Sequence, residues 1–87
     1  MKTFPLRISS PDGDVFNGDV TVLNVRGSEG ELAVMAGHIP FVSAVKPCRC
    51  SIGSADDSFR YGHTDGGILT VFADKAILLT GSFKFDE

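Results

Sequence analysis

Several features that would mark other classes of protein are absent from this chain of 87 residues. No apolar run approaches the roughly 18 residues that a membrane-spanning helix needs, and the N-terminus does not lead into the apolar block of a signal peptide. The eight lysines and arginines are scattered singly and the net charge is −3, whereas phosphate binding needs clustered cations. Nucleic acid is therefore not expected as a partner, and a cytoplasmic location is favoured, which still allows docking on a membrane complex.

Cysteine is scarce too: Cys48 and Cys50 are the only two, in a C-x-C pair. In a strand, residues two apart lie on one face, about 6.6 Å apart along the chain, and such neighbours rarely reach disulfide geometry. Two free structural thiols are the favoured interpretation. The alternative is a metal or redox site completed by His38 and His63, although the usual spacing of zinc ligands is absent.

The residues that are present predict one small all-β domain over residues 1–87. Apolar residues make up 43% of the chain and charged residues 22%, which is typical of a soluble globular protein. Ten glycines and four prolines interrupt the chain so often that no run at helical period fits between them, while β-branched and aromatic residues fill the intervals. We expect an antiparallel β-sandwich of eight to ten short strands. The expected strands are residues 3–9, 15–16, 19–26, 31–35, 39–45, 48–53, 58–63, 68–73 and 76–80, with a further short strand around Phe83 and Phe85. Phe4, Leu6 and Ile8 should share one face of the first strand, and a turn is expected at residues 27–30.

Two details of this pattern carry specific predictions. Asn17-Gly18 is the strongest two-residue hairpin signal in the sequence, so a turn is expected there. In the strand that should follow, the apolar alternation changes phase between Val22 and Leu23. Either a bulge lies near Leu23 or both faces of the strand are covered.

A search for catalytic chemistry finds nothing recognisable. No local motif joins a nucleophile to a base and an orienting acid, and Gly66-Gly67 precedes a strand rather than a phosphate-binding helix. Asp56-Asp57 is interpreted as a solvated turn. His38 is interpreted as a turn residue bonded to backbone or, alternatively, as a contact residue at a partner surface. No catalytic residue, cofactor or metal is therefore predicted.

One segment is more specific. Residues 27–40 read G-S-E-G-E-L-A-V-M-A-G-H-I-P, and Lys46-Pro47 follows at the expected distance. This pattern resembles the signature of the epsilon subunit of F-type ATP synthase, close to G-x-E-G-E-L-G-I-L-P-G-H-A-P and a Lys-Pro turn. The opening residues 6–20 and the strand G-G-I-L-T-V also match, so the resemblance covers about 80 residues. The departures are Ala33 for the usual Gly, Ala36 for the Pro before Gly-His, and Arg49 with a Cys on each side.

The resemblance implies a rotor protein, not an enzyme. Family members bind the gamma subunit and the polar loops of the c-ring and help to couple ring rotation to ATP synthesis, so this chain is expected on the cytoplasmic face of a bacterial inner membrane, as a peripheral part of the complex. The resemblance implies that Glu29 and Glu31 meet basic groups on the ring loops and that His38 lies near this contact. Phe41 and Val42 either pack on gamma or fill the core. The residues implied in contacts with the c-ring or gamma are Ser28, Glu29, Gly30, Glu31, His38, Phe41 and Val42.

The C-terminal helical hairpin of typical family members has no counterpart in this sequence, so neither its brake on hydrolysis nor its ATP binding is expected here. The ending Phe83-Lys84-Phe85-Asp86-Glu87 favours a naturally short chain. Two rivals remain. The stronger is a small sandwich that binds a ligand or metal through His38, His63 and the cysteine pair, and an enzyme is the weaker.

Overall fold

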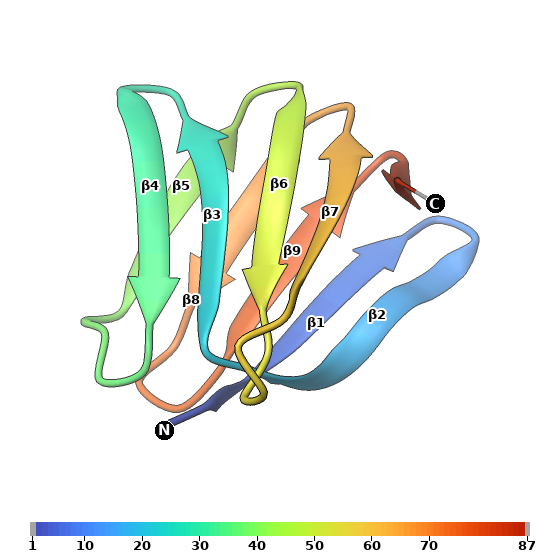
Figure 1. Cartoon of the computed structure of the whole chain (residues 1–87). Helices are drawn as coiled ribbons and strands as arrows, with labels where there is room; N and C mark the ends of the chain where they lie inside the picture. The colour runs from blue at the N-terminus through green and yellow to red at the C-terminus, as the bar shows by residue number, and fades with distance from the viewer. Residues whose placement is uncertain (1, 87) are drawn as a thin grey trace.

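A computed structural model describes residues 2–86, and every regular element in that range is a strand (Figure 1). Met1 and Glu87, the ends of the expected 1–87 domain, lie outside the described residues. The described part of the chain contains no helix with the length and apolar character that crossing a bilayer requires. The ten strands are β1 (Phe4–Ser10), β2 (Gly13–Val20), β3 (Val22–Gly27), β4 (Gly30–Met35), β5 (Phe41–Val45), β6 (Cys48–Gly53), β7 (Phe59–Thr64), β8 (Gly67–Val71), β9 (Ala76–Thr80) and β10 (Phe83–Phe85).

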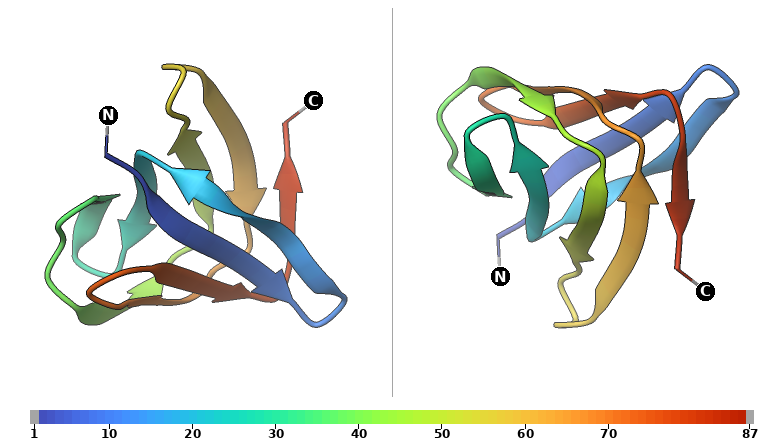
Figure 2. Two further views of the ribbon diagram at one scale, coloured as in Figure 1. Left: turned by 90° about the horizontal axis from the view of Figure 1, so that it is seen from below. Right: turned by 90° about the horizontal axis from the view of Figure 1, so that it is seen from above.

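The strands form two layers that belong to one continuous, strongly curved sheet. Its order is β10-β7-β6-β3-β5-β8-β9-β1-β2, with β4 attached to β3. Strands β4, β3, β6 and β7 lie in front in Figure 1, with β5, β8, β9 and β1 behind them. The end views in Figure 2 show how the sheet wraps around its interior. Strands β2 and β10 are the two ends of this order, and the ring centroids of Phe16 on β2 and Phe85 on β10 are 6.2 Å apart. The sheet is therefore close to a closed barrel.

The all-β fold is confirmed, but one pairing departs from the antiparallel expectation. Strands β1 and β9 run parallel, with Leu6 opposite Ala76 and Ile8 opposite Leu78. A parallel pair needs a long crossover, and here almost the whole chain lies between its two strands. The sheet is therefore mixed, and the first strand is held in place by the ninth.

The core lies between the two layers and comes from the alternating positions that the sequence indicates. Phe4, Leu6 and Ile8 share one buried face of β1, as expected. They meet inward side chains from both layers, among them Leu23 and Leu78, which are fully buried. Alternation along each strand thus supplies the burial that a chain of this length needs.

The predicted hairpin at Asn17-Gly18 is wrong. Strand β2 runs through both residues without a turn, because Asn17 and Gly18 pair with Arg7 and Leu6 of β1. The turn preference of two residues is outweighed by the ladder that an eight-residue strand forms with its neighbour. The actual turn of this hairpin is at Pro11-Asp12.

The change of phase near Leu23 also has a different cause from the two expected. Residues 19–26 are not one strand: the chain bends at Thr21, which separates β2 from β3. Val20 is the last residue of β2 whose side chain is buried, and Leu23 and Val25 are the first buried side chains of β3. The apolar pattern therefore shifts where the chain passes from one layer to the other.

Two glycine positions are dictated by geometry. Gly30 has a φ of +128°, in the region that favours glycine, directly after the two-residue turn Ser28-Glu29. At Gly67 a Cβ atom would collide with the carbonyl oxygen of Leu79, which precedes Thr80, the partner of Gly67 in the β8–β9 ladder. These contacts give a physical reason for the G-S-E-G and G-G-I-L motifs.

Candidate functional site

Six of the seven residues expected at a partner contact surround one hollow. The β3–β4 hairpin contributes Ser28, Glu29, Gly30 and Glu31, and β5 contributes Phe41 and Val42. The hollow has a volume of about 350 Å³ and is completed by Gly27, Leu32 and Ser43. It forms because the hairpin tip is anchored on β5: the N–H of Ser28 donates to the carbonyl oxygen of Ala44 at 3.2 Å.

The charge of this hollow is negative. Among the described residues that line it, Glu29 and Glu31 alone are ionisable. The Glu31 carboxylate lies 4.0 Å from the Arg26 guanidinium, the limit of an ion pair, and its side chain is 87% exposed. An exposed ion pair at this distance contributes little to the stability of the fold. The carboxylate is therefore available for a cation on another molecule.

The two apolar residues that β5 contributes to the hollow behave differently. Phe41 is half-buried and packs against the core, whereas Val42 is 67% exposed. Their side chains alternate across β5, so Phe41 points inward and Val42 outward. Phe41 therefore serves the core, and Val42 is free to contact a partner.

His38 does not lie beside the acidic hairpin. It sits in the loop after Met35, so the length of β4, roughly 17 Å at 3.3 Å per residue, separates it from the hairpin turn. Its Nδ1 is 2.7 Å from the carbonyl oxygen of Met35, and its Nε2 is 2.5 Å from that of Phe72. The ring also packs edge-on against Phe4 at 5.2 Å. The histidine thus ties the β4–β5 loop to the β8–β9 turn, in agreement with its interpretation as a turn residue bonded to backbone.

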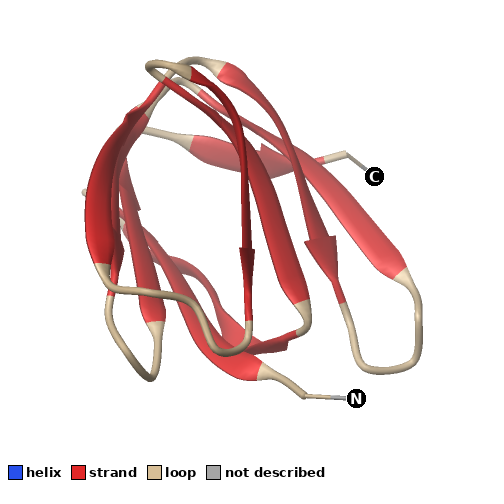
Figure 3. Ribbon diagram, turned by 90° about the vertical axis from the view of Figure 1, so that its left-hand side faces the viewer, coloured by secondary structure: helices blue, strands red, loops and turns tan. Residues whose placement is uncertain are grey.

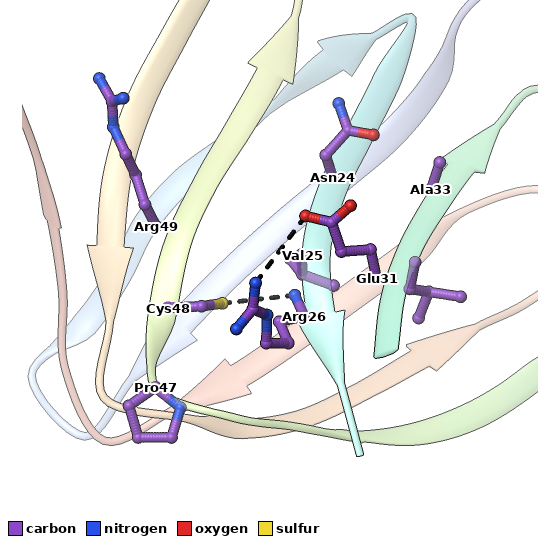
Figure 4. A pocket seen from close by; sticks show the side chains of 9 residues that line it. Asn24, Val25, Arg26, Glu31, Ala33, Pro47, Cys48 and Arg49 are labelled. Atoms are coloured by element: carbon purple, nitrogen blue, oxygen red, sulfur yellow. Dashed lines mark hydrogen bonds and ion pairs between the residues drawn. The ribbon is translucent and has the colours of Figure 1, made fainter. Parts of the chain in front are cut away.

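A second hollow, of about 600 Å³, opens where β3 and β6 part (Figure 4). The ladder between these strands ends at Asn24 and Ser51. Beyond that point the backbone N–H of Arg26 donates to the Sγ of Cys48 at 3.4 Å in place of a carbonyl. The thiol therefore fills a gap in the sheet, which is a structural role.

The cysteine pair gives no sign of a metal centre. Both cysteines are free, with their Sγ atoms 4.0 Å apart. Burial, together with the neighbouring Cys48, raises the pKa of Cys50 to about 12, which disfavours the thiolate that binds metals. Across residues 2–86 no three His, Cys, Asp or Glu side chains gather as a metal site would require. The set of His38, His63 and the two cysteines, which was the alternative interpretation, is thus not brought together.

Sequence reasoning missed an exposed apolar face on the rear layer. The outward residues of β5, β8 and β9 stand in two rows across the three strands, which contain no charged residue. Ile68 is 46% exposed and Leu79 is 53% exposed. The two rows are Ala44, Ile68 and Leu79, and Val42, Thr70 and Ile77. The absence of charge from these three segments was the signal in the sequence.

The front layer carries a contrasting outer surface. Arg49 lies over the Tyr61 ring at 4.4 Å and bonds to Asp86 at 3.2 Å, while His63 lies 2.9 Å from the same carboxyl group. The bond from His63, followed by that from Arg49, lowers the pKa of Asp86. The outer surface of the front layer thus carries a paired polar cluster beside the exposed rings of Phe59 and Tyr61, whereas the three strands of the rear face carry no charge.

Comparisons with known proteins agree on one family. Residues 3–85 match the model of the ATP synthase delta/epsilon chain β-sandwich domain. The chain is 36% identical over 87 residues to the ATP synthase epsilon chains of Bacillus thuringiensis (strain Al Hakam) and Bacillus cereus (strain B4264). These matches cover 94% of this chain but 61% of each relative, so the chain spans about three fifths of the length of these curated relatives.

Solved structures agree on the fold. A chain in the mitochondrial ATP synthase of Euglena gracilis, in a structure of OSCP, F1 and the c-ring, superimposes with a TM-score of 0.90 at 20% identity, over 95% of this chain and 53% of that one. A chain in the central stalk and c-ring structure of the Tetrahymena thermophila mitochondrial ATP synthase gives a TM-score of 0.80 at 13% identity. This match covers 95% of the present chain and 66% of that one. At these identities the likeness concerns the fold alone.

Proposed function

We propose a function from one premise: the chain belongs to the family of ATP synthase delta/epsilon chain β-sandwich domains. It acts as a central-stalk subunit of an F-type, proton-translocating ATP synthase. It binds a gamma-type subunit and the polar loops of the c-ring, and it helps to transmit rotation between the ring and the catalytic head. In this role it makes and breaks no bonds.

The observation that carries this proposal is the contrast between two surfaces. The acidic hairpin, with Glu29 and Glu31, lies at one end of the molecule, and the apolar rows of β5, β8 and β9 cover one side. A coupling subunit needs two separate contacts on one stiff body. A sheet that is curved almost into a barrel and cross-linked by ladder bonds provides that stiffness.

The acidic hairpin suits the ring. Its carboxylates are exposed and weakly paired, so they can meet basic groups on the polar loops. Exposed ion pairs contribute about 0.2–1 kcal/mol each, so they set orientation and encounter rate more than affinity. Ser28 and Gly30 shape the two-residue turn that presents them.

The apolar face suits gamma. Burial of apolar surface, at about 25 cal/mol per Å², is the main source of affinity at protein interfaces of this kind. Val42 joins the two contacts, since it lines the hollow and also stands in one of the apolar rows. His38 acts indirectly, because it holds the loop that leads into β5.

The complex places this chain at the cytoplasmic face of a bacterial inner membrane, peripheral to the bilayer. Attachment passes through the gamma and ring contacts.

The test is a pull-down of the tagged chain with the gamma subunit and c-ring of the same organism. We expect all three to co-purify. In the assembled enzyme, Glu31→Cys should cross-link to a cysteine placed in a ring loop. The matched control is Ala55→Cys, an exposed turn position between β6 and β7, which should not cross-link. A chain that binds neither gamma nor the ring would refute the proposed function. An assembled enzyme without the Glu31 cross-link would refute only the assignment of the hairpin.

A further inference from the structure

Two strand edges beside the acidic hairpin are unpaired. Among residues 2–86, β4 pairs with β3 alone. Strand β5 pairs with β8 on one side, while on the other only Val45 pairs, with Gly27. Figure 3 views the molecule from the side on which β4 and β5 lie. We call the region between these two edges the β4–β5 seam, defined by residues 30–35 and 41–44.

The hairpin register shows which backbone groups of β4 point into the seam. Gly27 and Gly30 flank a two-residue turn, so this pair exchanges both of its hydrogen bonds. Bonded and non-bonded pairs alternate along an antiparallel ladder. The N–H and C=O groups of Glu31 and Ala33 and the N–H of Met35 therefore point away from β3, towards the unpaired edge, while the Met35 carbonyl is bonded to His38.

Strand β5 presents its groups in the same way. The carbonyl of Ala44 accepts from Ser28, which lies on the side away from β8. Val42, two residues earlier, directs its own N–H and C=O to that side as well. A strand edge with free donors and acceptors is a template for another strand. The chemistry that matches this edge is a second extended backbone.

The side chains of the seam specify what such a backbone should carry. The hollow of about 350 Å³ lies directly beside the edge and contains Leu32, Phe41 and Val42 as its apolar lining. The charged residues of its described lining are Glu29 and Glu31, and Glu31 also borders the second hollow. Successive side chains of an added strand point to opposite faces, so every second residue could enter the hollow. The complementary segment is apolar at alternate positions and carries a lysine or arginine at the hairpin end.

We propose that the β4–β5 seam binds an extended segment of a rotor subunit as an added β-strand, apolar at alternate positions and basic at the end that meets Glu29 and Glu31. The identity of the partner rests on the proposed function, whereas the mode of binding rests on the free edge. Main-chain bonds then supply affinity, and the hollow and carboxylates supply selectivity.

Backbone amide exchange tests this mode directly. In the free chain, the amides of Glu31, Ala33 and Met35 should exchange fast and those of Leu32 and Val34 slowly. When the chain binds the purified rotor complex, or a synthetic peptide that alternates valine with lysine, exchange at the three outward amides should slow by about ten-fold or more. A peptide that alternates valine with glutamate is the control and should leave them fast.

A matched pair of variants tests the same edge. Ala33→Pro removes an outward N–H without removing a bond to β3, and proline is tolerated on edge strands. Ala33→Ser keeps the N–H. We expect Ala33→Pro to weaken binding of the valine–lysine peptide by about ten-fold, and Ala33→Ser to leave it unchanged, with both variants folded by circular dichroism.

These experiments distinguish failure of strand addition from failure of the proposed function. If the chain assembles with the rotor but the outward amides stay fast and Ala33→Pro assembles normally, strand addition is overturned and the proposed function stands. If the chain ignores the rotor yet the basic peptide protects the outward amides, the edge is a strand-binding site and the proposed function is overturned.

Discussion

The apolar rear face offers the sharpest test of how this domain is attached. Ile68 and Leu79 stand side by side on β8 and β9, 46% and 53% exposed. Replacing both by threonine removes apolar surface but keeps residues that favour strands. Since neither side chain is in the core, the free energy of unfolding should change by no more than about 0.5 kcal/mol per site.

The expected loss of affinity follows from the exposed fractions. Complete burial of an Ile or Leu side chain is worth about 1.5–3 kcal/mol, and roughly half of each remains to be buried by a partner. Each residue could therefore contribute about 1 kcal/mol to binding. Because threonine keeps one methyl group, we expect the double variant to lose about 1–2 kcal/mol, which raises the Kd for the gamma-type subunit about 5- to 30-fold.

Titration calorimetry with purified gamma measures this change, and thermal unfolding by circular dichroism shows that the variant is folded. The control is the double variant Phe59→Thr with Tyr61→Thr. These two side chains lie on β7, in the opposite layer, and are 47% and 41% exposed. The control should bind as the unaltered chain does. If the β7 variant weakens binding and the β8–β9 variant does not, the wrong face has been assigned.

Three further predictions concern stability. Gly67→Ala should lower the melting temperature markedly, since the new Cβ would collide with the carbonyl of Leu79 and the β8–β9 ladder would have to shift. Thr80→Val should cost about 1–3 kcal/mol in denaturant unfolding, because the Thr80 hydroxyl, bonded to the Thr64 hydroxyl at 2.6 Å and to the carbonyl oxygens of Gly66 and Ser82, would be lost; an unchanged midpoint would contradict this. Asp86 has its pKa lowered from the ordinary 3.8 by its histidine and arginine partners, so its stabilising contribution is present above pH 3.8 and is lost as the pH falls through the lower native value. Asp86→Asn should therefore flatten the acid limb of the stability–pH curve, and an unaltered limb would show that the pair contributes nothing.

The sequence was a good guide wherever neighbouring residues carried the information. Strands 48–53 and 76–80 were predicted with the bounds that the structure has. The turn at Ser28-Glu29 followed from its flanking glycines, and the burial of Phe4, Leu6 and Ile8 followed from alternation. These features depend on backbone preference and on a period of two, and both can be read within a few residues.

The predictions that failed concern relations between distant segments. Asn17-Gly18 has a strong local turn preference, yet pairing with β1 keeps it extended. The 27–40 motif implied that His38 lies close to the acidic hairpin, but β4 is extended and separates the two. Local signals say nothing about which remote strand will be the neighbour.

Composition, turn chemistry and the 27–40 motif were enough to give an all-β domain and its family. Which surfaces are apolar, which edges stay unpaired and where β1 and β9 meet depended on the folded arrangement. An alternating pattern shows that two residues share a face, but only the pairing of strands far apart in the chain sets what that face touches. That pairing is chosen by the packing of the whole core at once, and no single segment contains it.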